Sequence, residues 1–145
     1  MLRNIWGNGP YVEGWAVYAQ QLMTDEGYLD HDPNLRLSLL KWWLRSVGNT
    51  ILDVRLQTMG MTEPQALDFM INQTYQEREE AVAKVQRAQL SSCQLDMYYA
   101  GAKGWDEVRA HDQRRHPKDF SLKAFHERAL GEGAVPLETL DRLLH

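Results

Sequence analysis

The segment between Pro33 and Met59 constrains the fold most, because apolar side chains recur along it at every third or fourth residue. The repeating positions are Leu37, Leu40, Leu44, Val47, Ile51 and Val54. This spacing places the side chains on one face of an α-helix, and further Leu and Trp residues widen the apolar arc. We therefore expect a long helix near the centre of the molecule, with Gly60 as its C-terminal cap.

The remaining sequence also predicts helices. We expect them over about residues 11–26, 62–72, 74–89, 91–115 and 121–130, followed by a final turn or two after Pro136. Capping boxes beginning at Thr62 and Thr74 open two of these segments. No stretch shows the alternation of apolar and polar residues that is typical of a strand. The sequence thus predicts a single all-α domain over residues 1–145, an irregular helical bundle built around the long central helix.

Composition and charge exclude several classes of protein. The formal net charge of −4 gives no reason to expect nucleic-acid binding. Cys93 is the only cysteine, so no intrachain disulfide forms, which suits a reducing compartment. Neither a signal-like start nor an apolar run of about 20 residues is present, so we expect no membrane association and a cytoplasmic location by default. The abrupt start, two turns before the most distinctive motif, favours a fragment of a larger protein.

That motif, Tyr-Val-Glu-Gly-Trp-Ala-Val-Tyr-Ala, occupies residues 11–19. Gly14 lowers helix stability by about 1 kcal/mol relative to Ala, so the close approach of another backbone or of a ligand should justify it. Glu13 has the chemistry of a metal ligand, and Trp15 and Tyr18 could line its surroundings. Alternatively, Glu13 only complements the helix dipole, as acidic residues in a first turn commonly do.

The segment from Glu13 to Ala19 resembles the Glu-Gly-Trp-Ala-x-Tyr-Ala helix of the DUF885 family. Members of that family resemble gluzincin zinc metallopeptidases, in which a His-Glu-x-x-His motif supplies two zinc ligands and a later helix supplies a Glu. The resemblance implies that Glu13 is the third ligand. It extends from Pro10 to the Gly131–Leu137 segment. Because no His-Glu-x-x-His motif occurs in these 145 residues, we expect no zinc to be bound by this chain alone.

A polar line runs along the otherwise apolar long helix. Arg45, Asn49, Asp53 and Gln57 follow one another at steps of four residues. The line either faces solvent as a charged stripe, or it is hydrogen-bonded or faces a wet cavity. We assign Asp53 and Gln57 to substrate binding. The family resemblance implies a His at the position of Gln57, and Gln cannot shuttle protons near neutral pH as His does.

A third group of candidates lies between Arg87 and Trp105. Gln94, Tyr98, Gly101 and Trp105 follow helical spacing, and the stretch resembles a late helix of the family. By that resemblance Tyr98 is the catalytic residue that stabilises an oxyanion, while Arg87 and Gln94 bind substrate. The alternatives are a core aromatic for Tyr98 and a surface position for Arg87. Two other features are set aside: His126-Glu127 lacks the second His of a zinc helix, and Asp30-His31-Asp32 reads as a surface turn.

Two functions follow from these observations. The first is the C-terminal part of a DUF885-type zinc hydrolase acting on a peptide or amide, inactive on its own, to which Glu13 contributes a metal ligand. The second is a non-catalytic helical module that forms a homodimer through apolar surface on the 11–26 and 33–59 helices. An unrelated helical domain with a chance match to the motif is a third possibility.

Overall fold

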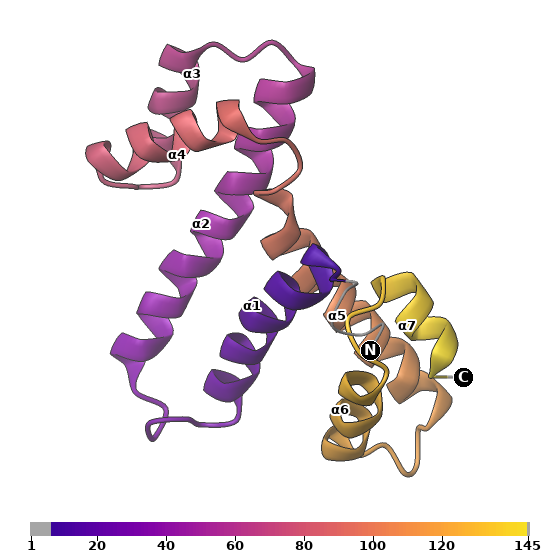
Figure 1. Cartoon of the computed structure of the whole chain (residues 1–145). Helices are drawn as coiled ribbons and strands as arrows, with labels where there is room; N and C mark the ends of the chain where they lie inside the picture. The colour runs from indigo at the N-terminus through magenta and orange to yellow at the C-terminus, as the bar shows by residue number, and fades with distance from the viewer. Residues whose placement is uncertain (1–6, 145) are drawn as a thin grey trace.

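The computed structural model describes residues 7–144, and within this range the chain is all-α, as predicted. Figure 1 shows a long helix, α2, with short helices at one end and a second group of helices beside its lower half. The elements are α1 (Gly9–Asp25), α2 (Pro33–Thr58), α3 (Glu63–Asp68), the π-helical turn η2 (Phe69–Gln73), α4 (Arg78–Leu90), α5 (Asp96–Arg115), α6 (Leu122–Gly131) and α7 (Leu137–Leu143).

Side-chain caps define the starts of the first two helices. Asn8 accepts a hydrogen bond from the Tyr11 N–H at 2.9 Å, and Pro10 occupies the first turn of α1, where its missing N–H costs nothing. Asp32 caps α2 in the same way by accepting from the Asn34 N–H. Asp32, at the end of the intervening turn, is therefore a helix cap, and α2 runs back antiparallel to α1 (Figure 1).

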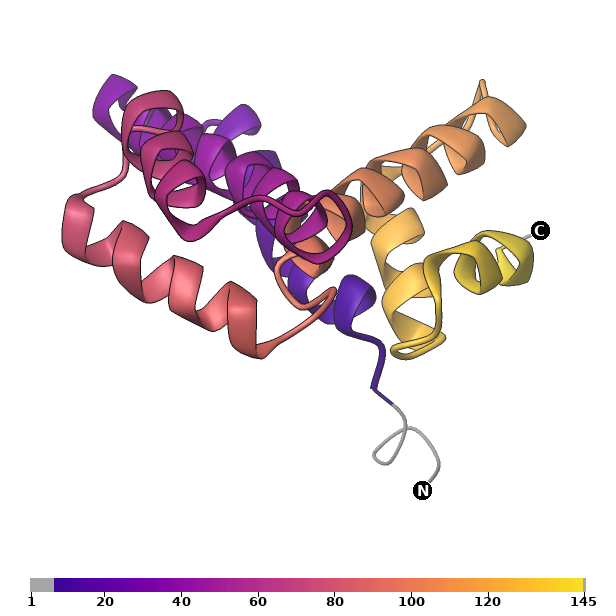
Figure 2. The ribbon, with the colours of Figure 1, turned by 90° about the horizontal axis from the view of Figure 1, so that it is seen from above.

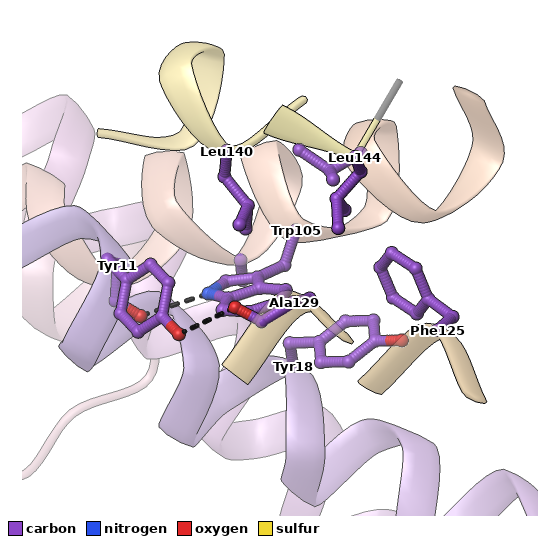
Figure 3. Close-up of a cluster of buried hydrophobic side chains, with 9 residues drawn as sticks. Tyr11, Tyr18, Trp105, Phe125, Ala129, Leu140 and Leu144 are labelled. Carbon is purple, nitrogen blue, oxygen red and sulfur yellow. Dashed lines mark hydrogen bonds between the residues drawn. The ribbon is translucent and has the colours of Figure 1, made fainter. Parts of the chain in front are cut away.

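One hydrophobic cluster joins α1, α5, α6 and α7. Trp105 of α5 is fully buried at its centre and donates its indole N–H to the Tyr11 backbone carbonyl at 2.9 Å. Tyr11 in turn donates its hydroxyl to the Ala129 carbonyl, as Figure 3 shows. Phe125, Leu140 and Leu144 close the cluster from α6 and the C-terminal end. The tyrosines of the 11–19 motif are thus mainly core residues that attach α1 to the C-terminal helices.

Gly14 marks the place where α1 crosses α5 at backbone contact. A Cβ built on Gly14 would overlap the backbone of Gly101, and a Cβ built on Gly101 would overlap the carbonyl of Pro10. Both glycines are buried. Of the two explanations that the sequence offered for Gly14, another backbone or a ligand, the structure supports the backbone, and Gly101 is its counterpart.

A second hydrophobic cluster lies at the other end of the molecule, around the C-terminal half of α2. It contains Leu52, buried residues of α3, η2 and α4, and Leu95 just before α5. Seen from above in Figure 2, α3 and α4 lie on one side of the molecule, and α6 and α7 lie on the other. The beginning of α5 is the link between the two clusters.

Three sequence predictions about the elements need correction. Residues 62–72 form α3 and then a π-helical turn, because the helix widens at Phe69. Thr74 opens no helix: its buried hydroxyl donates to the Met70 carbonyl, and α4 starts only at Arg78. The helix expected from residue 91 starts at Asp96, because Cys93 has a left-handed backbone (φ 60°) that an α-helix cannot contain.

The apolar face of α2 is only partly buried. Leu52 is fully buried, whereas Leu37 is 68% exposed and Leu40 is 57% exposed. The N-terminal half of α2 therefore presents apolar side chains that no described element covers. None of the helices in residues 7–144 combines the length and apolarity needed to cross a bilayer.

Candidate functional site

A cleft of about 420 Å³ lies between α1 and the N-terminal half of α2, with side chains of α4 and Tyr98 of α5 at its margin. Its volume is within the range of small-molecule sites. The apolar part of the wall comes mostly from α2 and includes Leu39, Leu40, Trp42 and Trp43. The α1 wall is made of Ala16, Val17, Gln20, Gln21, Thr24 and Asp25.

The cleft gathers positive charge on a chain whose net charge is negative. Four cations line it (Arg36, Arg45, Lys84 and Arg87), against the single carboxylate of Asp25. Lys84 and Arg87 are three residues apart and therefore project from the same side of α4. Burial lowers the pKa of Lys84 and the charges of Arg45 and Arg87 lower that pKa further, while the charge of Glu80 partly offsets them. The excess of cations among the side chains that line the cleft favours the binding of an anion.

Two of these cations have protein partners. Arg45 forms an ion pair with Glu80 of α4, and its guanidinium also lies 5.0 Å from the ring centre of Trp42. Arg87 donates to the side-chain oxygen of Gln94 at 2.7 Å. The structure thus brings together two predicted substrate-binding residues, Arg87 and Gln94. Tyr98, the predicted catalytic residue, shares the cleft with Arg87.

Glu13 does not itself line the cleft, but it lies on the same side of α1 as the residues that do. Ala16, Val17 and Gln20 line the cleft, and Glu13 precedes them by three, four and seven residues, which is the spacing of one helix face. Glu13 is partly exposed and forms no hydrogen bond or ion pair with any described residue. The opposite face of α1, which includes Tyr11, Gly14 and Tyr18, is buried against α5 and α6. Gly14 thus fixes the helix whose free face carries Glu13.

Two residues of the polar line of α2 form hydrogen bonds with the backbone at the ends of other helices. Gln57 donates its amide to the carbonyls of Ala88 and Ser91, at 2.8 and 2.9 Å, where α4 ends. Asp53 is 1% exposed and accepts the Leu95 N–H at 3.2 Å, just before the first residue of α5. Of the two readings of the line, hydrogen bonding therefore holds for Asp53 and Gln57. Neither residue lines the cleft, so the structure does not place Asp53 or Gln57 where a ligand in the cleft would touch them.

A second carboxylate, Asp96, lies near Asp53. Burial raises the pKa of Asp96, and the negative charge of Asp53 raises it further. One buried oxygen of each carboxylate, Oδ1, has no hydrogen-bond partner among residues 7–144. The N-terminus of α5 offsets this repulsion in part, because the helix dipole favours negative charge there.

The described part of the chain contains no group of three His, Cys, Asp or Glu side chains able to hold a metal ion. Glu13 offers one carboxylate and belongs to no such group among these residues. His126 takes part in packing: its Nε2 lies 2.9 Å from the Tyr18 hydroxyl, and burial, followed by the charge of Arg109, lowers its pKa. Trp15 packs against His126 and Trp105, so it belongs to the core more than to the surroundings of Glu13.

Sequence reasoning missed the contribution of Lys84, Asn49 and Trp43 to one cleft. The residue spacing of Lys84 and Arg87 was a usable signal, because two cations three residues apart share a helix face. Asn49 was visible as part of the polar line. What the sequence could not supply was the packing of α4 beside α2, which brings these side chains together.

The fold is all-α, and its cleft is lined by cationic, aliphatic and aromatic side chains. The sequence matches the family described as "Bacterial protein of unknown function (DUF885)" over residues 1–144, so the chain belongs to the DUF885 family. A solved structure from Shewanella oneidensis, described as a putative lipoprotein of unknown function, is similar, with 43% identity and a TM-score of 0.90. The match covers 95% of this chain and 25% of that chain. No curated protein matches the sequence significantly.

Proposed function

We propose that this chain forms one part of a zinc-dependent hydrolase of peptides or amides, in which Glu13 is a metal ligand and the cleft holds part of the substrate. The observation that carries the proposal is the position of Glu13 on the cleft-facing side of α1, without a partner among the described residues. A carboxylate fixed on a rigid helix and left unpaired has the properties of a ligand. In a protein of the length of the Shewanella relative, the remaining ligands and the general base would come from the other three quarters of the chain.

Tyr98 lies at the margin of the same cleft and has no hydrogen bond to a described residue. Its phenol is therefore available to donate to a developing oxyanion. Arg87, held by Gln94, is available to pair with a negatively charged part of the substrate. Asp53 and Gln57 support this arrangement indirectly, since they position the end of α4 and the start of α5, which carry Arg87 and Tyr98.

The experiment compares zinc content and peptidase activity of this chain with those of a DUF885 chain extended to the length of the relative. We expect stoichiometric metal and activity only in the extended chain, and loss of both in its Glu13→Gln variant. Glu107→Gln, at an exposed position of α5, is the matched control and should retain both. An extended chain without metal, or a fully active Glu13→Gln variant, would contradict the proposal.

A second function is favoured by the exposed apolar side chains of α2. Leu37 and Leu40 are more than half exposed, although they belong to one regular helix face. Such a patch favours association, so the chain alone is proposed to form a homodimer. The compartment is a separate proposal: the description of the relative as a putative lipoprotein favours export to a membrane surface over the cytoplasmic default. Fractionation of the native protein distinguishes the two.

A further inference from the structure

The cleft combines cations, an unsatisfied buried amide and an apolar wall, and this combination is more specific than a general anion site. We propose that it binds the C-terminal end of an apolar peptide: Lys84 and Arg87 pair with the free carboxylate, and Asn49 accepts the N–H of the last peptide unit. This inference deepens the proposed function by naming the end of the substrate that the cleft holds, but the binding itself needs no metal.

The charge of Lys84 supports the carboxylate part of the proposal. Lys84 is half-buried and forms no ion pair or hydrogen bond with a described residue, whereas its cationic neighbours Arg45 and Arg87 are each held by a partner. Like charges kept together in a concave site attract an anion, since the anion removes their mutual repulsion. The positions of Arg45 and Arg87 are already fixed, so little ordering is needed when the anion binds.

Asn49 distinguishes a peptide from a simple anion. It lines the cleft, is only 6% exposed, and its Oδ1 has no hydrogen-bond partner among the described residues. A buried amide oxygen needs a donor. A free carboxylate offers only acceptors to it, and hydrogen phosphate has a single O–H, whereas the N–H of the peptide bond that precedes a terminal carboxylate is a donor close to that carboxylate.

The wall of the cleft indicates the side chains of the peptide. Leu39, Leu40 and Trp43 line it with apolar surface. Aromatic and aliphatic surface of this kind favours a hydrophobic C-terminal residue such as Phe or Leu. The three features therefore match three parts of one ligand: carboxylate, peptide N–H and apolar side chain.

The test measures binding of the 145-residue chain by isothermal titration calorimetry to acetyl-Ala-Ala-Phe with a free carboxylate. Two analogues are compared with it. One is the C-terminal amide of the same peptide, which lacks the free carboxylate. The other keeps the free carboxylate but has an ester in place of the last peptide bond, so it lacks the last N–H. We expect both the amide and the ester to bind at least about tenfold more weakly than the acid, because each loses one recognition contact. Inorganic phosphate should bind more weakly than the acid peptide.

Two variants assign these contacts to residues. Lys84→Met should weaken binding of the acid by about tenfold and leave binding of the amide unchanged. Asn49→Ala should weaken binding of the acid peptide. It should also abolish the difference in affinity between this peptide and the analogue with an ester in place of the last peptide bond. Lys123→Met, at an exposed position of α6 outside the cleft, should behave as wild type. If a cleft variant does not fold, the binding of both peptides to the wild-type chain is measured at several salt concentrations instead. The affinity for the acid should then fall with salt more steeply than the affinity for the amide.

The inference is overturned if acid and amide bind equally, if neither binds, or if phosphate binds as tightly as the acid peptide. A result of this kind leaves the proposed function standing, because Glu13 and metal content are tested separately. The converse result is a 145-residue chain that binds the peptide and an extended chain that holds no metal. That result would support peptide binding in the cleft and contradict the proposed zinc-dependent hydrolase.

Discussion

At the scale of single residues, Gly14 shows how a locally unfavourable residue is fixed by a tertiary contact. Ala in place of Gly14 would gain about 1 kcal/mol in helix propensity. The added Cβ would overlap the Gly101 backbone, which cannot rotate away as a side chain can. Since overpacking costs about 1–3 kcal/mol and more where backbone must move, we expect Gly14→Ala to lower the free energy of unfolding by about 1–2 kcal/mol.

Urea unfolding followed by circular dichroism checks this expectation. Gly131→Ala is the matched control, because Gly131 is also helical but a Cβ there would meet no atom within 4 Å. The control should be neutral or slightly stabilising. If Gly14→Ala proves as stable as the control, the α1–α5 crossing is not held at backbone contact.

Asp96 supplies a pH-dependent prediction. Its pKa is raised above the ordinary value of 3.8, first by burial and then by Asp53. The folded chain therefore holds this proton more tightly than the unfolded chain does, so the contribution of Asp96 to stability is greatest at low pH and is lost as pH rises through the raised pKa. Asp96→Asn removes the ionisation while keeping the shape of the side chain.

We thus expect the stability of Asp96→Asn relative to wild type to increase between about pH 4 and about pH 7. Urea unfolding at several pH values gives the difference directly. Asp119→Asn, at an exposed site between α5 and α6, should show no such trend. A relative stability of Asp96→Asn that falls with pH would mean that the charge of Asp96 is favourable in the folded chain.

At the scale of elements, the polar line of α2 organises the junction between α4 and α5. The Gln57 side-chain amide donates to two backbone carbonyls at the end of α4, one of which belongs to the buried residue Ala88. Gln57→Ala removes both hydrogen bonds, and we expect a loss of about 1–2 kcal/mol in unfolding free energy. Gln89→Ala, at an exposed position of α4, should have little effect. Equal losses in the two variants would argue against this role.

The same elements show how far sequence reasoning reached. The helical spacing of apolar residues predicted the long helix to within a residue at each end, because a 3–4 period over many turns leaves few alternatives. The prediction of a helix beginning at Thr74 was wrong. A capping box requires a hydroxyl that accepts from the helix backbone, whereas the Thr74 hydroxyl is buried and donates to the Met70 carbonyl. For the candidate site, Arg87, Gln94 and Tyr98 proved to be neighbours, but the cleft also needs Lys84 and Asn49, whose convergence depends on tertiary packing.

At the scale of the whole molecule, the two hydrophobic clusters leave the beginning of α2 uncovered. Leu37 is 68% exposed but does not line the cleft, so it can be changed without altering the proposed peptide site. If the apolar start of α2 is the contact surface of a homodimer, replacing Leu37 by Lys places a charge in the interface of both copies. Two unpaired charges buried together are costly, so dissociation should result.

We expect light scattering coupled to gel filtration to give a dimer mass for the wild-type chain at high concentration, and a monomer mass for Leu37→Lys at the same concentration. Leu90→Lys is the control: Leu90 is 89% exposed at the end of α4, away from the start of α2, and the variant should remain dimeric. A wild-type monomer at every concentration would contradict self-association. In that case the exposed face of α2 would need another partner, and a chain of the relative's length offers one, since three quarters of that chain lies outside the matched region.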